Sequence, residues 1–406
     1  MITECRSCQS EQLRPILSLG DQYLSDFIDA KDKGKKPPQF PLDLVLCEPC
    51  SLLQLTESAP PALLYPDSYG YRSGINQTMR DHLAGVVREV AEIADVREGD
   101  TVVDIGSNDG TLLKAYPSTV HRVGYDLLRK FEGEYDQPNL EVRIGGFDGH
   151  DEPAKVITAI SCFYDLEDPN RFLEAVKASL APDGVFVVQQ NYLGGMIRQT
   201  AFDNICHEHL EYYSLSAMEA LLDRHGLEVF RVTENGLNGG SFRTYIRRAT
   251  GQGNGYGVEE MRLAERSLGL QDTATYEKFS QRAQETRDKL RELVLRETEA
   301  GKRVYVYGAS TRGNTILQYC DFGPEHIAGA AERNPEKWGK VIASSGIPIV
   351  SEAEARQAKP EYMMALPWFF RDEFVERERD YLEAGGSLIF PLPEPCIVTS
   401  RGVRML

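Results

Sequence analysis

Residues 204–214, NICHEHLEYYS, are the most unusual stretch of the chain for chemistry, because they place two of its seven histidines around a glutamate. In an extended segment His207 and His209 would share one face, with Glu208 on the other. An imidazole, with a pKa of about 6.5, is suited to act as a general base. Metal binding is the alternative, but the H-E-x-x-H spacing is absent and no third ligand is evident. We predict a catalytic role for at least one of these histidines.

A second candidate site is the turn in TVVDIGSNDG, residues 101–110, where an apolar segment runs into two glycines. Glycines let the backbone approach a ligand, and a helix N-terminus favours an anionic group. The next apolar segment ends at Asp126, about twenty residues on, where an acid can accept hydrogen bonds from ribose hydroxyls. A nicotinamide dinucleotide and S-adenosylmethionine both fit this pattern.

The glycine spacing favours S-adenosylmethionine. The third glycine of G-x-G-x-x-G is missing, whereas D-x-G-x-x-x-G suits a cofactor whose amino group is met by acidic residues and backbone carbonyls. Phe147, next to a further acid, is a candidate to flank the adenine. The predicted cofactor-binding residues are Asp104, Gly106, Asn108, Gly110, Asp126 and Asp148.

Two cysteine pairs, Cys5-x-x-Cys8 and Cys47-x-x-Cys50, supply four thiolates in the arrangement that builds a tetrahedral zinc site. Residues 9–46 separate the pairs, a longer stretch than in most zinc ribbons. Four protein ligands leave no position for a catalytic water, so the predicted zinc is structural and compensates for a small core. The other cysteines are predicted to be buried apolar residues: Cys162, Cys206, Cys320 and Cys396.

Alternating apolar strands and amphipathic helices must position these residues. After a predicted helix at 79–96, the segments 101–105, 122–126, 155–160, 171–180 and 184–190 alternate in the way that builds a parallel, helix-covered sheet. A long charged helix is predicted at 276–301, and a second α/β unit follows with strands in 303–310, 326–332, 347–350, 362–367 and 387–393.

The predicted fold class is therefore α/β with three parts. A small zinc-binding module spans residues 1–66, with a solvated loop at 31–38. A Rossmann-like class I methyltransferase domain spans 67–252, and a second Rossmann-like domain spans 253–406 after a linker at 252–257.

Composition excludes several classes of protein. The formal net charge of −17 repels nucleic acid, and the sequence contains no basic stripe to offset it. The chain contains no apolar run long enough for a membrane span, and its start, MITECRSCQS, lacks the pattern of a signal peptide. We expect a cytoplasmic protein without membrane contact. The oligomeric state stays open, a monomer included.

These motifs together resemble the sugar C-methyltransferases of deoxysugar biosynthesis, which methylate a nucleotide-linked 4-keto-hexose next to its carbonyl. The likeness covers nearly the whole chain. Its motifs are FPLDLVLCEPCSLLQL with the paired cysteines, YGYRSG, DIGSNDG, HEH, NGGSFR, YGASTRGN, AERNPEKWGK, LPWFFRDEF and GGSLIFPLPE.

The resemblance implies a set of catalytic residues. His209 would be the base, with Glu208 and His207 nearby, and Tyr71 of YGYRSG would face the sugar. This chain departs from the family at Cys206, where the family has a tyrosine. It also reads SCFYDLEDP, with Tyr164, in a region where the family tends to carry a histidine. These departures imply a subfamily with its own sugar or a different methylated position.

The resemblance also implies a mechanism. His209, aligned by Glu208, would remove the proton beside the ketone, and His207 or a tyrosine hydroxyl would stabilise the enolate. The nucleotide diphosphate of the sugar would be held by the second α/β unit, at the turn after residues 303–307. The predicted substrate-binding residues are Ser310, Thr311, Arg312, Asn314 and Arg333.

Three other functions stay open at this point. An oxygen or nitrogen methyltransferase would need a base but no ketone. A dehydrogenase would bind a dinucleotide at the second turn, for which Glu332 is a candidate ribose-binding acid. A noncatalytic zinc scaffold would not bind S-adenosylmethionine.

Overall fold

The computed structural model describes residues 1–66, 70–251 and 255–406. Both predicted domain boundaries, and half of the predicted linker at 252–257, fall at residues outside this description. The domain limits therefore stay predictions. In the part of the chain that the structure covers, no helix is both long and apolar enough to cross a membrane.

The N-terminal sheet is antiparallel and has the order β1-β3-β4-β10. Three of its strands are local: β1 (Leu13–Tyr23), β3 (Gln39–Cys47) and β4 (Leu53–Leu55). The fourth, β10 (Glu211–Tyr212), comes from the middle of the chain, directly after the two histidines. In addition, β2 (Phe27–Asp29) pairs with β15 (Lys340–Ile342) of the C-terminal region. The N-terminal module is therefore joined by backbone hydrogen bonds to both other parts of the molecule.

The middle sheet has seven strands in the order β11-β12-β9-β8-β5-β6-β7. The last five are mutually parallel, while β12 and β11 are antiparallel to their neighbours. Its strands are β5 (Thr101–Ile105), β6 (His121–Asp126), β7 (Leu140–Ile144), β8 (Ala154–Ile160), β9 (Leu180–Asn191), β11 (Leu227–Asn235) and β12 (Ser241–Arg248). This mixed, doubly covered sheet confirms the Rossmann-like methyltransferase fold, and the carboxyl ends of its parallel strands share one edge.

Helices with one apolar face cover the middle sheet. In α2 (Gln77–Ile93) the buried residues recur at helical spacing, as Leu83, Val86, Val87 and Val90, and the side chain of Asn76 caps the helix by accepting from the Thr78 amide. The other helices of this region are α1 (Pro61–Leu64), α3 (Pro169–Ser179), α4 (Leu193–Arg198), α5 (Leu215–Arg224) and α6 (Val258–Leu268). The predicted helices at 79–96 and 171–180 are confirmed.

The C-terminal sheet also has seven strands, in the order β16-β14-β13-β17-β18-β19-β20, with the first five parallel. The strands are β13 (Val304–Tyr307), β14 (Gly329–Glu332), β16 (Ile349–Ser351), β17 (Tyr362–Ala365), β18 (Ser387–Phe390), β19 (Cys396–Thr399) and β20 (Gly402–Met405). Its helices are α8 (Thr311–Tyr319), α9 (Glu352–Gln357), α10 (Arg371–Arg377) and α11 (Arg379–Glu383). The second Rossmann-like sheet is therefore confirmed.

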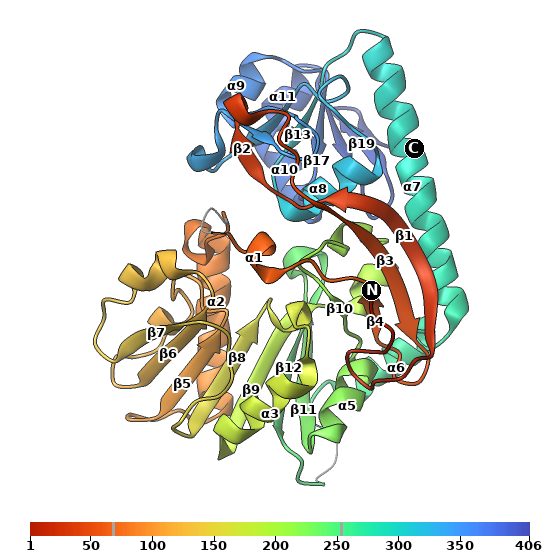
Figure 1. Cartoon of the computed structure of the whole chain (residues 1–406). Helices are drawn as coiled ribbons and strands as arrows, with labels where there is room; N and C mark the ends of the chain where they lie inside the picture. The colour runs from red at the N-terminus through yellow and green to blue at the C-terminus, as the bar shows by residue number, and fades with distance from the viewer. Residues whose placement is uncertain (67–69, 252–254) are drawn as a thin grey trace.

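The long helix α7 (Thr273–Glu299) connects the middle sheet to the C-terminal sheet, and the long strands β1 and β3 run beside it (Figure 1). Buried residues of β1, β3 and β4 join α7 and the C-terminal sheet in one apolar core. A second core joins three of the zinc-site cysteines to the middle sheet. The N-terminal module thus stabilises the arrangement of the two larger sheets.

Candidate active site

Four cysteine sulfurs converge in the N-terminal module. The Sγ atoms of Cys5 and Cys50 lie 3.6 Å apart and those of Cys8 and Cys47 3.4 Å apart, and all four atoms lie within 4.8 Å of one another. Sulfur atoms bound tetrahedrally to one zinc ion would be about 3.8 Å apart. The four side chains therefore fit one zinc ion, and they would fill its coordination shell.

The N-terminal sheet, in which Cys47 ends β3 and which we call the zinc-bearing sheet, extends directly to the segment that carries the two histidines. The amide of Leu55 on β4 donates to the carbonyl of Leu210 at 2.9 Å. From there β10 continues the pairing, with Glu211 opposite Gln54. Because Leu210 follows His209, the zinc-bearing sheet fixes one end of this segment.

The predicted cofactor turn has the backbone conformation that its glycines allow. Gly106 and Gly110 have φ angles of 70° and 72°, and Asn108 has 52°. The carboxylate of Asp126, at the end of β6, accepts from the Asn108 amide at 2.7 Å and from the Leu128 amide at 2.7 Å. The turn and the predicted ribose-binding acid are thus brought together at the carboxyl edge of the sheet.

Residues 70–74 lie across this turn. The side chain of Asn108 accepts from the Ser73 amide at 3.0 Å and donates to the Tyr71 carbonyl at 3.4 Å, while Asp109 accepts from the Gly74 amide at 2.9 Å. Tyr71 itself is about half exposed, at 49%. The structure therefore places Tyr71 beside the cofactor turn.

Asp104 and Asp148 occupy contrasting environments. Asp104 is buried and accepts a hydrogen bond from the Thr158 hydroxyl at 2.5 Å, and burial raises its pKa to about 7. Asp148 is exposed, and the neighbouring Phe147 packs edge-on against Tyr125 with ring centroids 5.0 Å apart. Asp104 therefore lies on β5, directly before the cofactor turn and bonded to β8, whereas Asp148 lies on the surface.

The histidine segment is a turn, so the expected extended conformation is wrong. The amide of His209 donates to the Cys206 carbonyl at 3.1 Å, which reverses the chain and points the two imidazoles toward different partners. His207 is buried against β3, with its Nε2 3.1 Å from the Phe40 carbonyl. The expectation that His207 and His209 share one face is therefore also wrong.

His209 lies between the middle sheet and the C-terminal sheet. Its Nδ1 is 2.9 Å from the Asn204 carbonyl, which can only accept, so Nδ1 carries the proton and Nε2 keeps its lone pair. The Tyr164 ring packs against the imidazole with centroids 4.3 Å apart. Burial, with a smaller effect of the Arg312 charge, lowers the pKa of His209 to about 4. The imidazole is therefore neutral near pH 7 with an unprotonated Nε2, and its burial makes it a weaker base than a free imidazole.

Glu208 reaches toward the C-terminal sheet from the same turn. Its Oε1 is 3.4 Å from the Thr311 hydroxyl at the start of α8, and burial raises the pKa of its carboxyl group. The turn thus presents His209 and Glu208, but not His207, to the region between the two large sheets. Cys206 is buried, as the sequence predicted for an apolar residue.

The predicted substrate-binding residues form intramolecular contacts. The Ser310 hydroxyl caps α8 by accepting from the Gly313 amide at 3.1 Å, Asn314 accepts from Ser344 at 2.5 Å, and Arg333 pairs with Glu352 at 3.2 Å. Arg312 donates from Nε and Nη2 to Asp203 at 3.0 and 2.7 Å and from Nη1 to the Asn238 carbonyl. Its guanidinium therefore first serves to join the C-terminal domain to the middle domain.

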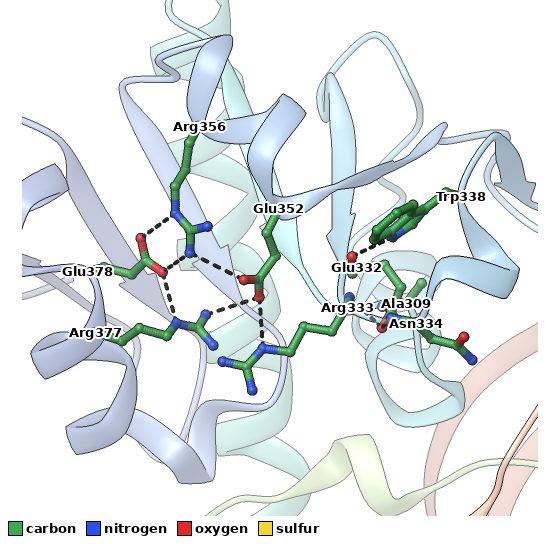
Figure 2. A network of polar contacts seen from close by, with 9 residues as sticks. All are labelled: Ala309, Glu332, Arg333, Asn334, Trp338, Glu352, Arg356, Arg377 and Glu378. Atoms are coloured by element: carbon green, nitrogen blue, oxygen red, sulfur yellow. Dashed lines mark hydrogen bonds and ion pairs between the residues drawn. The ribbon is translucent and has the colours of Figure 1, made fainter. Parts of the chain in front are cut away.

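A polar network lies along the carboxyl edge of the C-terminal sheet (Figure 2). Glu332 accepts from the amides of Ala309, Arg333 and Asn334 at 2.9, 2.8 and 3.0 Å. Beside it, Glu352 and the buried Glu378 are bridged by two arginines, Arg356 and Arg377. Arg333 joins this network through its ion pair with Glu352. The guanidinium that was predicted to bind the substrate is therefore already paired with a carboxylate.

Sequence reasoning missed Asp203, Asn204 and the role of Trp368. Asp203 is fully buried, and its carboxylate accepts from Arg312 and from the Trp368 indole at 3.0 Å. Asn204 holds His209 through its carbonyl. The available signal was weak: Asp203 is a charged residue next to Phe202 and Ile205, and a buried charge requires a partner.

The fold and the site together define an S-adenosylmethionine-dependent methyltransferase. Residues 76–232 match the family model described as "Methyltransferase domain", residues 5–65 match "Putative zinc binding domain", and residues 236–393 match "C-methyltransferase C-terminal domain". The curated C-methyltransferase NovU of Streptomyces niveus is 32% identical over 411 residues, which cover 98% of each chain. The chain therefore belongs to this family of C-methyltransferases.

The chain also has a partial likeness to solved methyltransferase structures. A methyltransferase from Clostridium acetobutylicum has 12% identity and a TM-score of 0.37, and covers 42% of this chain and 92% of its own. The plantazolicin methyltransferase BpumL, in complex with SAH, has 13% identity and a TM-score of 0.32, with 41% and 82% covered.

Proposed function

We propose that this enzyme methylates a nucleotide-linked 4-keto-deoxyhexose on the carbon next to the carbonyl, with His209 as the base. The observation that carries this proposal is the hydrogen bond from His209 Nδ1 to the Asn204 carbonyl. It fixes the tautomer in which Nε2 is the proton acceptor. A base of this kind is needed because methylation of carbon starts with removal of a C–H proton.

His209 Nε2 would take the proton beside the ketone, and the C–H electron pair would pass into the enolate. S-adenosylmethionine, when bound, supplies an electrophilic methyl group on sulfur. Tyr164, packed on the imidazole, and Glu208, beside Thr311, would hold the sugar against His209. The glycine turn after β5 and Asp126 would hold S-adenosylmethionine, whose sulfur would release the methyl group to the enolate carbon and keep the electron pair of the carbon–sulfur bond.

His207 is a poor candidate to stabilise the enolate, because its Nε2 is taken by the Phe40 carbonyl and its ring is buried against β3. Tyr71 and Tyr164 are the aromatic residues that lie nearer to the cofactor turn and to His209. We therefore propose that the hydroxyl group of one of these two tyrosines, and not His207, stabilises the enolate.

The C-terminal domain, residues 253–406, would bind the nucleotide part of the substrate. An open hollow of about 770 Å³ lies between the loop after β11 and the loop after β17, large enough for a ligand of nucleotide size, with both Arg371 and acidic residues in its lining. Phe369 and Phe370 line it, and Arg312 lies over the Phe369 ring at 5.1 Å from its centroid. Arg312 therefore stands between this cavity and the histidine turn, where a diphosphate would have to pass.

The proposal predicts a specific product. A panel of nucleotide-linked 4-keto-sugars is incubated with S-adenosylmethionine, and products are analysed by mass spectrometry and NMR. We expect one added methyl group, bonded to carbon beside the ketone. A methyl group on oxygen or nitrogen would instead support the alternative methyltransferase reaction.

The free thiols of the chain agree with a cytoplasmic location, which we also propose.

A further inference from the structure

The buried carboxylate of Asp203 holds two distant segments of the C-terminal domain. Asp203 belongs to the 3-10 turn Phe202–Asn204, which precedes the histidine turn. Its Oδ2 accepts from Arg312 on α8 at 2.7 and 3.0 Å and from the Trp368 indole, after β17, at 3.0 Å. A carboxylate that is 0% exposed is stable only with such partners, so these contacts fix where the C-terminal domain docks.

The next residue, Asn204, holds the predicted base. Its carbonyl accepts from His209 Nδ1 at 2.9 Å, and its side chain accepts from Asn191, at the end of β9, at 2.9 Å. A third contact, from the Thr315 hydroxyl on α8 to the Ile205 carbonyl at 3.0 Å, holds the same stretch. Because Asp203 and Asn204 are adjacent in one tight turn, displacement of the first moves the carbonyl of the second.

We propose that Asp203 is a positioning residue: by binding Arg312 and Trp368, it makes the docking of the C-terminal domain set the orientation of the His209 imidazole. The expected effect of Asp203 on turnover rests on the proposed role of His209 as base. The expected effect of Asp203 on the orientation of the imidazole does not. A domain that binds the nucleotide of the substrate would thereby also align the base that acts on the sugar.

The direct test measures the His209 tautomer in the ligand-free protein. Protein labelled with ¹⁵N-histidine is compared by NMR for the parent and Asp203→Asn, with the His209 signal assigned from its absence in His209→Asn. We expect the Nδ1–H tautomer alone in the parent, because the Asn204 carbonyl accepts that proton. In Asp203→Asn we expect both tautomers, since the turn is no longer held by the charged pair.

Glu378→Gln is the matched control. Glu378 is also a buried carboxylate that binds two arginine side chains in the C-terminal domain, at 2.6 Å to Arg356 and 2.9 Å to Arg377, but it does not belong to the histidine segment (Figure 2). It should lower thermal stability while His209 keeps one tautomer and turnover keeps its parent value. An equal change of tautomer in this control would overturn the inference, because it would make the effect one of general destabilisation.

Trp368→Phe covers the case in which Asp203→Asn does not fold. It removes only the indole N–H that Asp203 accepts and keeps an aromatic ring in place. Asp203→Asn should reduce turnover roughly 100-fold, the cost of a misplaced catalytic group, with Trp368→Phe affected less. S-adenosylmethionine affinity should stay within about twofold in both.

The outcomes separate this inference from the proposed function. Parent tautomer and parent turnover in both Asp203→Asn and Trp368→Phe would contradict the positioning role. A changed tautomer in these variants, combined with full turnover in His209→Asn, would support the positioning role and contradict the role of His209 as base.

Discussion

The two Rossmann-like sheets share one local arrangement. In the middle sheet, Asp126 at the end of β6 accepts from the amide of Asn108, in the turn after β5, at 2.7 Å. In the C-terminal sheet, Glu332 at the end of β14 accepts from the amide of Ala309, in the turn after β13, at 2.9 Å. In each case an acid after the second strand holds the turn after the first, which is the geometry of a nucleotide site.

The two turns differ in how many of their residues have a positive φ. The first contains three residues with positive φ, Gly106, Asn108 and Gly110. At the second, Gly308 has a positive φ of 84°, and Lys337 donates to the Ala309 carbonyl at 2.7 Å, as Lys114 donates to the Asp109 carbonyl at 2.8 Å in the first. The same fold thus offers one turn with the glycine spacing suited to S-adenosylmethionine, and another that is followed by Arg312, which joins the C-terminal domain to Asp203 of the middle domain.

The largest expected effect concerns the proton removal that we propose for His209. His209→Asn should lower turnover by roughly 100-fold to 10,000-fold, the range for loss of a general base, because Nε2 would no longer accept the proton. Cofactor affinity should stay nearly constant. Turnover assays and calorimetry check this. A parallel loss of stability and of both affinities would instead assign His209 a packing role.

Zinc should matter because the zinc-bearing sheet holds β10 next to the histidine turn. Cys47→Ser should release about one zinc per chain and lower the melting temperature by roughly 5–10 °C, since three thiolates bind zinc less tightly than four. Metal analysis and thermal unfolding measure both. Cys320→Ser, at a buried cysteine far from the cluster, is the control and should retain the metal. A Cys47→Ser protein with parent stability would show that the site does not support folding.

The two acids give the sharpest direct comparison of the sheets. Asp126→Ala should weaken S-adenosylmethionine binding by about 1–3 kcal/mol, as expected for loss of a charge-assisted hydrogen bond to ribose. Glu332→Ala should leave that affinity unchanged, and neither protein should reduce NAD or NADP. Calorimetry with both variants measures this. If Glu332→Ala weakened S-adenosylmethionine binding as much as Asp126→Ala did, the assignment of the cofactor to the turn after β5 would be wrong.

The smallest expected effect is a pH dependence of cofactor affinity. Burial raises the pKa of Asp104 to about 7, so this carboxyl group is largely neutral below pH 7 and ionised above it. The ionised form attracts the positively charged cofactor, so affinity should rise with pH, by up to about tenfold per unit below the pKa. Asp104→Asn should flatten this dependence. A parent protein with constant affinity between about pH 6 and 8 would place the cofactor charge away from Asp104.

The local features of the fold could be predicted from the sequence, because they depend on neighbours in the chain. The cysteine pairs, the strand 101–105 with its glycine turn, and the helix at 276–301 all have short-range signals in residue type or period. Asp126 was found in the same way, since its distance from the turn follows from one strand–helix–strand unit.

Long-range contacts could not be predicted in this way. Nothing in Glu211–Tyr212 indicates that it completes a sheet begun at Leu13, and the turn at Cys206–His209 contains no glycine or proline to mark it. Arg312 resembled a free anion donor because its partner, Asp203, is distant in sequence. Such residues become visible only when the packing of the two domains is known.

The central claim is that His209 generates an enolate beside the ketone of a nucleotide-linked sugar, and solvent exchange tests it most directly. The enzyme is incubated with a nucleotide-linked 4-keto-sugar in D₂O without S-adenosylmethionine, and deuterium beside the ketone is followed by NMR. The account predicts enzyme-dependent exchange at one carbon, which disappears in His209→Asn and persists in His207→Asn. Exchange at the parent rate in a folded, ligand-binding His209→Asn protein would contradict it.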